Sequence, residues 1–229
     1  MYSAKGSVWG RSPGLAQRFA GLLLCLSACS AAWPTDLQVR VLQQNGAPLR
    51  GAVITVHVIA ASAPAPAPIK AVMDQLDLTF TPDLMVIPVG STVNFSNNDR
   101  VGHEVYSYSS PHPFKLGLYR GNGHPPELFD RPGLVTLGCN IHDAMLAYIL
   151  VTDAPYYGTT AADGSWTQAD IVRGKYRIEV WSPRLAGAGQ MLQQEITVNP
   201  GEHAQTEIRA DRALRPGQRQ ARPHSWDAY

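Results

Sequence analysis

The feature that most constrains this chain is a seven-residue segment, Cys139 to Met145 (CNIHDAM), that lies between two apolar runs. Gly133–Leu137 precedes the segment and Leu146–Val151 follows it, and both runs have the length and composition of β-strands. A short loop between two paired strands would hold a thiol, an imidazole and a thioether close together. The pattern therefore predicts a β-fold that presents three soft donor groups at one end of a sheet.

These donors are suited to a soft metal ion. Cys139, His142 and Met145 supply a thiolate, an imidazole and a thioether, and His103 is well placed to give a fourth ligand. One thiolate, two imidazoles and a weak axial thioether form the ligand set of a mononuclear blue (type-1) copper site, whose chemistry is the movement of single electrons. The alternative is that Cys139 and Met145 are ordinary core residues and that His103 is a buried imidazole with its hydrogen bonds satisfied.

Cysteine usage favours the metal site. Residues 1–32 have a positively charged start, a short apolar core at Phe19–Leu26 and small residues up to Ala32, which is the pattern of a secretory signal peptide. Cys25 and Cys29 lie in this leader, so cleavage after Ala32 would leave Cys139 as the one cysteine. A single thiol in an oxidising compartment cannot form an internal disulfide, and a bond to copper would occupy it.

The leader also fits a second interpretation. Leu26-Ser27-Ala28-Cys29 has the pattern of a bacterial lipoprotein processing site, in which Cys29 would be acylated and would anchor the protein to a membrane. Few residues separate Cys29 from the first expected strand at Asp36, which makes a short tether. Free export is favoured, and anchoring through Cys29 stays open.

Charge excludes one class of partner. The chain has 19 Lys and Arg and 18 Asp and Glu, and removal of the three positive residues of the leader leaves 16 against 18. This balance argues against nucleic acid. Arginines recur with Pro and Gly over residues 211–229, where we expect a disordered basic tail.

Alternating apolar residues predict strands and no helix. Asp36–Leu42 and Gly51–Ile59 flank an Asn45-Gly46 turn and are expected to form a hairpin. Alternating Ala and Pro at 63–68 indicate a stiff connector at a domain boundary. Short runs divided by turns then predict a compact Greek-key sandwich over residues 69–153, with strands at 76–80, 84–88, 92–96 and 103–108 before the two that flank the ligand loop.

The strands after residue 153 resemble the first two in character. They are expected at 174–181, 194–198 and 205–209. Because an isolated hairpin is marginally stable, residues 36–60 and 156–210 are predicted to close into one discontinuous β-sandwich. The predicted fold is all-β, with the 69–153 sandwich inserted into this second, smaller sandwich.

Several segments resemble known proteins. Asn94–Asp99, His103-Glu104-Val105 and Cys139-x-x-His142-x-x-Met145 resemble the cupredoxin pattern, with the ligand-loop spacing of amicyanin. Further segments resemble periplasmic methylamine utilisation proteins of the L-type cupredoxin group, namely 73–75, 105–107, 138–142 and 180–185. The flanking part is similar to carboxypeptidase-regulatory or carbohydrate-binding-like sandwiches, with an immunoglobulin- or prealbumin-like topology. The resemblance implies a periplasmic electron carrier with one copper ion and a redox protein partner, such as a cytochrome or a dehydrogenase.

One position departs from that pattern. Cupredoxins often place Asn directly after the first ligand histidine, and this chain has Glu104 there, which when ionised accepts hydrogen bonds and donates none. The bracing of the ligand loop is therefore expected from Asn97, Asn98 or Asn140. The resemblance also makes His142 the electron port, with rim residues expected at Pro111, Pro113 and Phe114.

Two other classes of function, a copper enzyme and a non-redox binding module, are alternatives to the electron carrier. A copper enzyme such as a nitrite reductase or oxidase would need a second metal site, for which the sequence shows no ligand set. The remaining histidines are expected to be solvated, namely His57, His112, His124, His203 and His224. The third class is a non-redox module that binds copper, carbohydrate or a cell surface.

Overall fold

The computed structural model describes residues 1–2, 6, 35–60, 63–185 and 190–216. The expected signal peptide with Cys25 and Cys29, and most of the expected tail, therefore lie outside the described residues. Within the described ranges the regular structure consists of sixteen strands in four sheets, without a helix. The all-β prediction is confirmed. Among these residues, no helix is present that is long and apolar enough to span a membrane.

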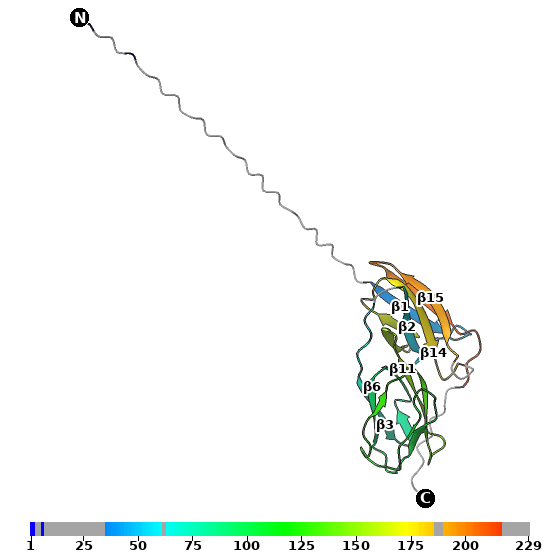
Figure 1. The fold of residues 1–229 in the computed structure, drawn as a ribbon. Helices are drawn as coiled ribbons and strands as arrows, with labels where there is room; N and C mark the ends of the chain where they lie inside the picture. Colours follow the sequence, from blue (N-terminus) through cyan, green and yellow to red (C-terminus); the bar gives the residue numbers. More distant parts are fainter. Residues whose placement is uncertain (3–5, 7–34, 61–62, 186–189, 217–229) are drawn as a thin grey trace. The chain divides into compact units, whose positions relative to one another are not determined.

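Two of the sheets are built from residues 36–60 and 156–209 (Figure 1). The three-stranded sheet has the order β13 (Ser165–Gln168), β1 (Asp36–Leu42) and β16 (His203–Arg209). The four-stranded sheet has the order β12 (Tyr156–Thr159), β2 (Val53–Ala60), β14 (Gly174–Trp181) and β15 (Leu192–Val198). Buried residues from both sheets share one core, which includes Leu37, Val39, Ile54, Tyr176 and Ile178. We call these strands the flanking sandwich.

The expected hairpin of the first two strands is wrong. The turn at Asn45-Gly46 does form, with Gly46 at a φ of 84° and the Gln43 N–H donating to the Ala47 carbonyl. After a single bridge between Leu42 and Pro48, however, the chain turns again at Gly51 and enters the opposite sheet. Alternation shows which face of a strand is buried, but it does not distinguish strands that pair from strands that face each other across a core.

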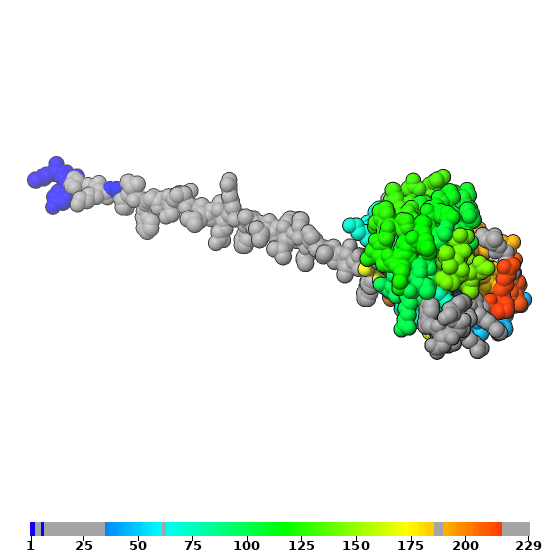
Figure 2. Space-filling view, turned by 90° about the horizontal axis from the view of Figure 1, so that it is seen from below, coloured from blue at the N-terminus to red at the C-terminus, as the bar shows by residue number. Residues whose placement is uncertain are grey.

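The other two sheets are built from residues 70–152. Green atoms from this part of the chain cover much of the face that Figure 2 shows. One has the order β5 (Leu84–Pro88), β11 (Leu146–Thr152), β10 (Gly133–Cys139), β7 (Val105–Ser107) and β8 (Phe114–Lys115). The other has the order β4 (Thr79–Thr81), β3 (Lys70–Leu76), β6 (Ser91–Asn97) and β9 (Glu127–Phe129). Their shared core holds Phe80, Phe95, Phe129 and Leu137, together with Cys139 and Met145. We call these strands the ligand sandwich.

The strands β3 and β9 of the ligand sandwich were not predicted, and two further details also differ from the prediction. The run expected as one strand at 76–80 is split by a tight turn at Asp77 and Leu78, whose φ angles of 51° and 57° are left-handed. The strand β8 lies between residues 108 and 133, where no strand was expected. Neither feature carries the Gly or Asn-Gly signal of a hairpin, and a two-residue strand is too short for alternation to appear.

A third apolar cluster joins residues of both sandwiches. Trp181 and Val53 come from the flanking sandwich and are buried against Leu150 of β11, with Tyr148 and Met191 partly buried beside them. The rings of Tyr148 and Trp181 meet edge to face with centroids 5.2 Å apart. The two sandwiches are therefore held by a packed contact as well as by the connecting chain.

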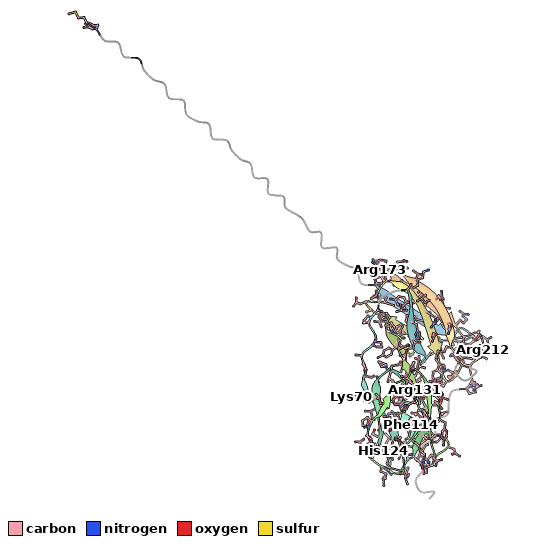
Figure 3. All side chains as sticks on the ribbon, viewed as in Figure 1. Lys70, Phe114, His124, Arg131, Arg173 and Arg212 are labelled. Atoms are coloured by element: carbon pink, nitrogen blue, oxygen red, sulfur yellow. The ribbon has the colours of Figure 1, made fainter. Side chains whose placement is uncertain are left out.

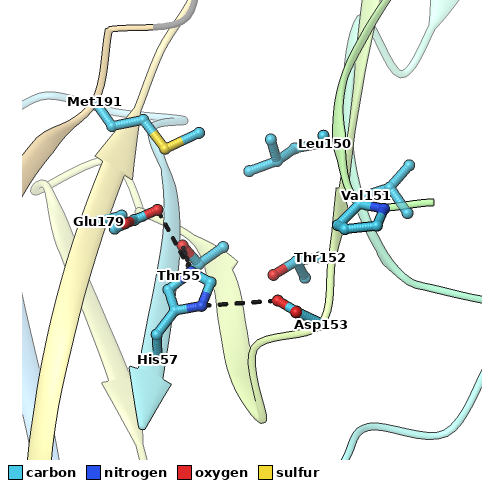
Figure 4. Close-up of a pocket in the computed structure, with 10 residues that line it drawn as sticks. Thr55, His57, Leu150, Val151, Thr152, Asp153, Glu179 and Met191 are labelled. Carbon is cyan, nitrogen blue, oxygen red and sulfur yellow. Dashed lines mark hydrogen bonds and ion pairs between the residues drawn. The ribbon is translucent and has the colours of Figure 1, made fainter. Parts of the chain in front are cut away.

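A crevice beside this cluster contains His57, which was expected to be solvated. Figure 4 shows its ring between two carboxylates, with Nε2 3.4 Å from Oε2 of Glu179 and Nδ1 3.7 Å from Oδ1 of Asp153. The His57 side chain is 24% exposed, so it is partly buried at this contact. The alternation of apolar and polar residues correctly placed His57 on the outward face of its strand. It could not show that the ligand sandwich covers that face.

Candidate metal centre

Strand register brings His103 and Cys139 together. Cys139 ends β10 and lies opposite Val105 of the neighbouring strand β7, two residues beyond His103. His103 itself is fixed by two backbone hydrogen bonds with Tyr119, its N–H donating at 3.1 Å and its carbonyl accepting at 3.0 Å. His142 follows in the loop between β10 and β11. The end of β10, the segment that leads into β7 and one short loop therefore supply the three residues.

The donor atoms of these residues form a compact triangle. Nδ1 of His103 lies 3.5 Å from Sγ of Cys139, and Nδ1 of His142 lies 3.8 Å from the same sulfur. The two Nδ1 atoms are 3.2 Å apart. At an ion about 2.0 Å from each nitrogen and about 2.3 Å from the sulfur, pairs of these donor atoms would subtend angles of roughly 105–125°. The triangle therefore fits one ion bound by all three residues, and its donor types are those of a soft metal.

Met145 lies in the same buried cluster as Cys139. Its side chain is 2% exposed, and its N–H donates to the His142 carbonyl at 3.0 Å. This hydrogen bond closes the loop into a tight turn just before β11. The structure thus brings His103, Cys139 and His142 together around one point, and it buries Met145 at the base of the same loop.

Hydrogen bonds favour the anionic sulfur. Burial disfavours a thiolate, but hydrogen bonds from His103, from the N–H groups of Glu104 and Ile141, and from His142 outweigh burial, and the pKa of Cys139 is lowered to about 6. Burial likewise opposes a charged imidazole, yet Cys139 and Asp99 raise the pKa of His103. At neutral pH the sulfur is therefore an anion, which is the form that binds metal.

We expect this thiolate to be measurable in the metal-free protein. The ultraviolet absorbance of the thiolate, taken as the difference between the wild type and Cys139→Ser, should rise with a midpoint near pH 6, against about 8.5 for an ordinary cysteine. Because the folded state releases this proton more readily than the unfolded state, the thiol contributes stability above the unfolded pKa, and this contribution is lost as pH falls through 6. A midpoint near that of an ordinary cysteine would contradict the arrangement described.

The residues expected to brace the site differ in what they do. Nδ2 of Asn97 donates to the carbonyls of Val101 and Tyr119, at 3.0 and 2.8 Å, and so holds the turn before His103. The Asn140 N–H donates to the Glu104 carbonyl at 2.9 Å, which ties the ligand loop to β7.

The side chains of Asn98 and Glu104 face other partners. Glu104 pairs with Lys115 at 2.5 Å and accepts a long hydrogen bond of 3.4 Å from Nδ2 of Asn140. Nδ2 of Asn98 donates to Asp74 at 2.9 Å. The Glu104 side chain therefore contacts the ligand loop through Asn140, while the hydrogen bond of the Asn98 side chain goes to Asp74.

Sequence reasoning missed Asp99. Its Oδ2 lies 3.1 Å from Nε2 of His103, and both side chains are buried. Asp99 was included only as the last residue of the Asn94–Asp99 segment, and its carboxylate was assigned no role. The spacing of four residues between Asp99 and His103 was the available signal, but a hydrogen bond to a ring nitrogen is not encoded in a local pattern.

The expected rim of the site is wrong in part. Pro111 packs against Gly133 at the start of β10. Cys139 ends the same strand, roughly 20 Å away, so Pro111 lies far from the ligand loop. Phe114 packs on Phe95 and Phe129, and Figure 3 shows it between Arg131 and His124. The exposed apolar neighbour of His142 is Ile141, which is 49% exposed.

The other histidines lie elsewhere. His112 stacks on Phe129 with centroids 4.3 Å apart, so it is not solvated as expected, while His124 packs edge-on against Tyr119 and His203 lies near Asp36. His224 is outside the described residues. In the part of the chain that the structure describes, His103, Cys139 and His142 are the group of three whose ligand atoms all lie within 4.8 Å of one another.

One family model matches part of the chain. It is described as polysaccharide lyase family 4, domain II, and it covers residues 136–206, which is less than half of the chain. The match begins within β10 and extends through the later strands of the flanking sandwich. No curated protein sequence is similar enough to count as a relative.

Among the solved structures that resemble part of the chain are cupredoxins and a copper-containing nitrite reductase. A purple cupredoxin from Nitrosopumilus maritimus is 23% identical, with 32% of this chain and 82% of that chain covered and a TM-score of 0.30. An amicyanin variant in its reduced Cu(I) form is 20% identical, with 43% and 99% covered and a TM-score of 0.33. A copper-containing nitrite reductase from Thermus scotoductus is 23% identical, with 49% and 28% covered and a TM-score of 0.34. These scores carry no argument about function, so the proposals below depend on the residues themselves.

Proposed function

We propose that this protein binds one copper ion at a type-1 site and carries single electrons. The observation that carries the proposal is the triangle of Nδ1 of His103, Sγ of Cys139 and Nδ1 of His142, with atoms 3.2–3.8 Å apart around a sulfur that favours the anionic form. Cys139 would give the strong thiolate bond, His103 and His142 the two imidazoles, and Met145 the weak fourth ligand. Copper, when bound, would supply the one-electron couple between Cu(I) and Cu(II).

The residues around the triangle suit electron transfer. His103 and Cys139 are 0% and 3% exposed, and they are fixed by backbone hydrogen bonds and strand pairing, so water is excluded and the donors are held in place. A site whose donors are already gathered needs little rearrangement when the charge of the ion changes. His142 is less buried and lies next to exposed Ile141, which makes it the proposed port for electrons.

The finer assignments belong to the same proposal. By resemblance, the protein would be a periplasmic member of the methylamine utilisation group, exported by residues 1–32 and serving a cytochrome or dehydrogenase. The ligand sandwich, at 69–153, would be a domain inserted into the flanking sandwich at 36–60 and 156–210. A catalytic role is not proposed, because turnover of a substrate would require a second centre. The polysaccharide lyase match favours carbohydrate binding by the flanking sandwich as a second candidate, which a glycan array with metal-free protein would test.

We expect the copper-loaded protein to be coloured and to cycle reversibly. One equivalent of Cu(II) should produce intense visible absorption and a type-1 electron-spin-resonance signal. Both should disappear on reduction and return on reoxidation with copper retained, because the buried donors bind both oxidation states. Absorption spectra, electron-spin resonance and voltammetry measure this, with the zinc-loaded protein as the colourless control. A colourless copper complex, or loss of the ion on reduction, would contradict the electron-carrier proposal.

A further inference from the structure

Asp99 contacts the side of His103 that is opposite to the sulfur. Its Oδ2 lies 3.1 Å from Nε2 of His103, while the other ring nitrogen, Nδ1, lies 3.5 Å from Sγ of Cys139. The side chains of Asp99 and His103 are 2% and 0% exposed, so water does not compete for Nε2. An ionised carboxylate accepts hydrogen bonds and donates none, so Nε2 must carry the proton. When the imidazole is neutral, Nδ1 therefore keeps its lone pair and faces the other two donors.

The Asp99 carboxylate is itself fixed by one N–H group that is distant in sequence and by one that follows it directly. The Leu78 N–H donates to Oδ2 at 2.8 Å, and the Arg100 N–H donates to Oδ1 at 2.7 Å. The N–H of Asp99 donates to Oδ1 of Asn97 at 3.0 Å. Leu78 belongs to the left-handed turn between β3 and β4, which aims its N–H at the carboxylate. The orientation of Asp99 thus depends on the β3–β4 turn, which supplies the Leu78 N–H, and on its own turn, which supplies the Arg100 N–H.

We infer that Asp99 is a positioning residue for this centre, which holds His103 in the tautomer and orientation that direct Nδ1 toward Cys139 and His142. The inference rests on the proposed function for the identity of copper, but the role applies to any ion that Nδ1 of His103 binds. A carboxylate on the far nitrogen of a ligand histidine fixes the ring and makes it a better donor, and loss of such a partner typically costs about 10–100-fold in metal affinity.

The substitution Asp99→Asn tests this role. An asparagine offers one acceptor oxygen and one NH2 group to the three donors that meet Asp99, so at least one N–H must face the NH2. Oδ2 meets two of these donors, Leu78 and His103, and Oδ1 meets Arg100 alone, so the amide oxygen is expected at the position of Oδ2. Nε2 of His103 then donates to a neutral amide oxygen, which is a weaker acceptor than a carboxylate and makes the ring a poorer metal ligand. We expect the dissociation constant for Zn(II), measured on the full chain by competition with a chelator, to rise by about 10–100-fold. In the zinc-loaded protein, the nuclear magnetic resonance signal of Nε2–H should shift toward that of a weaker hydrogen bond.

The matched control is Asp74→Asn. The Asp74 carboxylate also accepts from three donors, namely Oγ of Ser96 at 2.8 Å, Nδ2 of Asn98 at 2.9 Å and the Gln75 N–H at 2.9 Å, and none of these three residues is a proposed ligand. We expect its Zn(II) dissociation constant to stay within about twofold of the wild type. Wild-type affinity in Asp99→Asn, or an equal loss in Asp74→Asn, would overturn the inference. Because zinc is the probe, weakened binding in Asp99→Asn supports the role of Asp99 even if the copper form carries no electrons.

Discussion

Replacing Cys139 with serine is expected to abolish the visible absorption of the copper-loaded protein completely. The intense absorption of a type-1 site arises from charge transfer between the thiolate and copper, and a serine hydroxyl stays protonated at neutral pH and cannot replace it. The other two residues of the triangle are histidines, which supply no anion. Cys139 is 3% exposed and its pKa is lowered to about 6, so it is the member of the triangle that does. Titration of the variant with Cu(II), followed by absorption and electron-spin resonance, measures the effect.

The chain provides a matched control for this substitution. Cys25 and Cys29 precede the flanking sandwich, and the double variant Cys25→Ser, Cys29→Ser keeps the triangle intact. It should therefore show the full absorption of the wild type with one equivalent of copper. Circular dichroism should be alike in all three proteins, since serine is close to cysteine in size. Colour that persists in Cys139→Ser, or that is lost in the leader variant, would place the copper on a different thiol.

The ligand loop could be predicted because its information is local. Cys139, His142 and Met145 recur at every third position, and the runs on either side of them pair as β10 and β11. His103 required a long-range contact, and the resemblance to a known pattern supplied it where periodicity could not. The structure brings His103 to the loop through the pairing of β10 with β7, which covers two residue pairs. So short a ladder leaves no alternation that would indicate its partner.

The features that were missed depend on which elements become neighbours. Asp99 accepts from Leu78 and from His103, and both contacts exist because the β3–β4 turn packs beside the turn before β7. The pairing of β1 with β16 is parallel and joins opposite ends of the chain, so a hairpin with β2 was the simpler expectation from sequence. His57 faces outward from its own sheet as expected, yet the ligand sandwich covers it. For β1, β2 and His57 the local pattern gave the buried or outward face correctly, and tertiary packing decided what lies against that face.

The contact between the two sandwiches leads to the second large effect. Each sandwich has a separate core, and Trp181 belongs to the third cluster, which joins them. Trp181 is 4% exposed and packs edge to face on Tyr148. Replacement of a buried tryptophan by alanine typically costs about 3–5 kcal/mol, because apolar contact is lost and a cavity remains. We expect Trp181→Ala to lower the free energy of unfolding by this amount and to separate one unfolding transition into two.

Two probes distinguish this outcome from a general loss of stability. Thiolate-to-copper absorption would follow the ligand sandwich, and far-ultraviolet circular dichroism would follow both sandwiches during urea unfolding. The control is Trp166→Ala, because Trp166 is partly buried against the flanking core alone. Trp166→Ala should lower the free energy of unfolding, but the transitions that the two probes report should still coincide. The cluster that joins the two sandwiches stays packed in this variant. Coincident transitions in Trp181→Ala, with a loss below about 1 kcal/mol, would mean that the junction contributes little, because a buried aromatic residue ordinarily costs more than that when truncated.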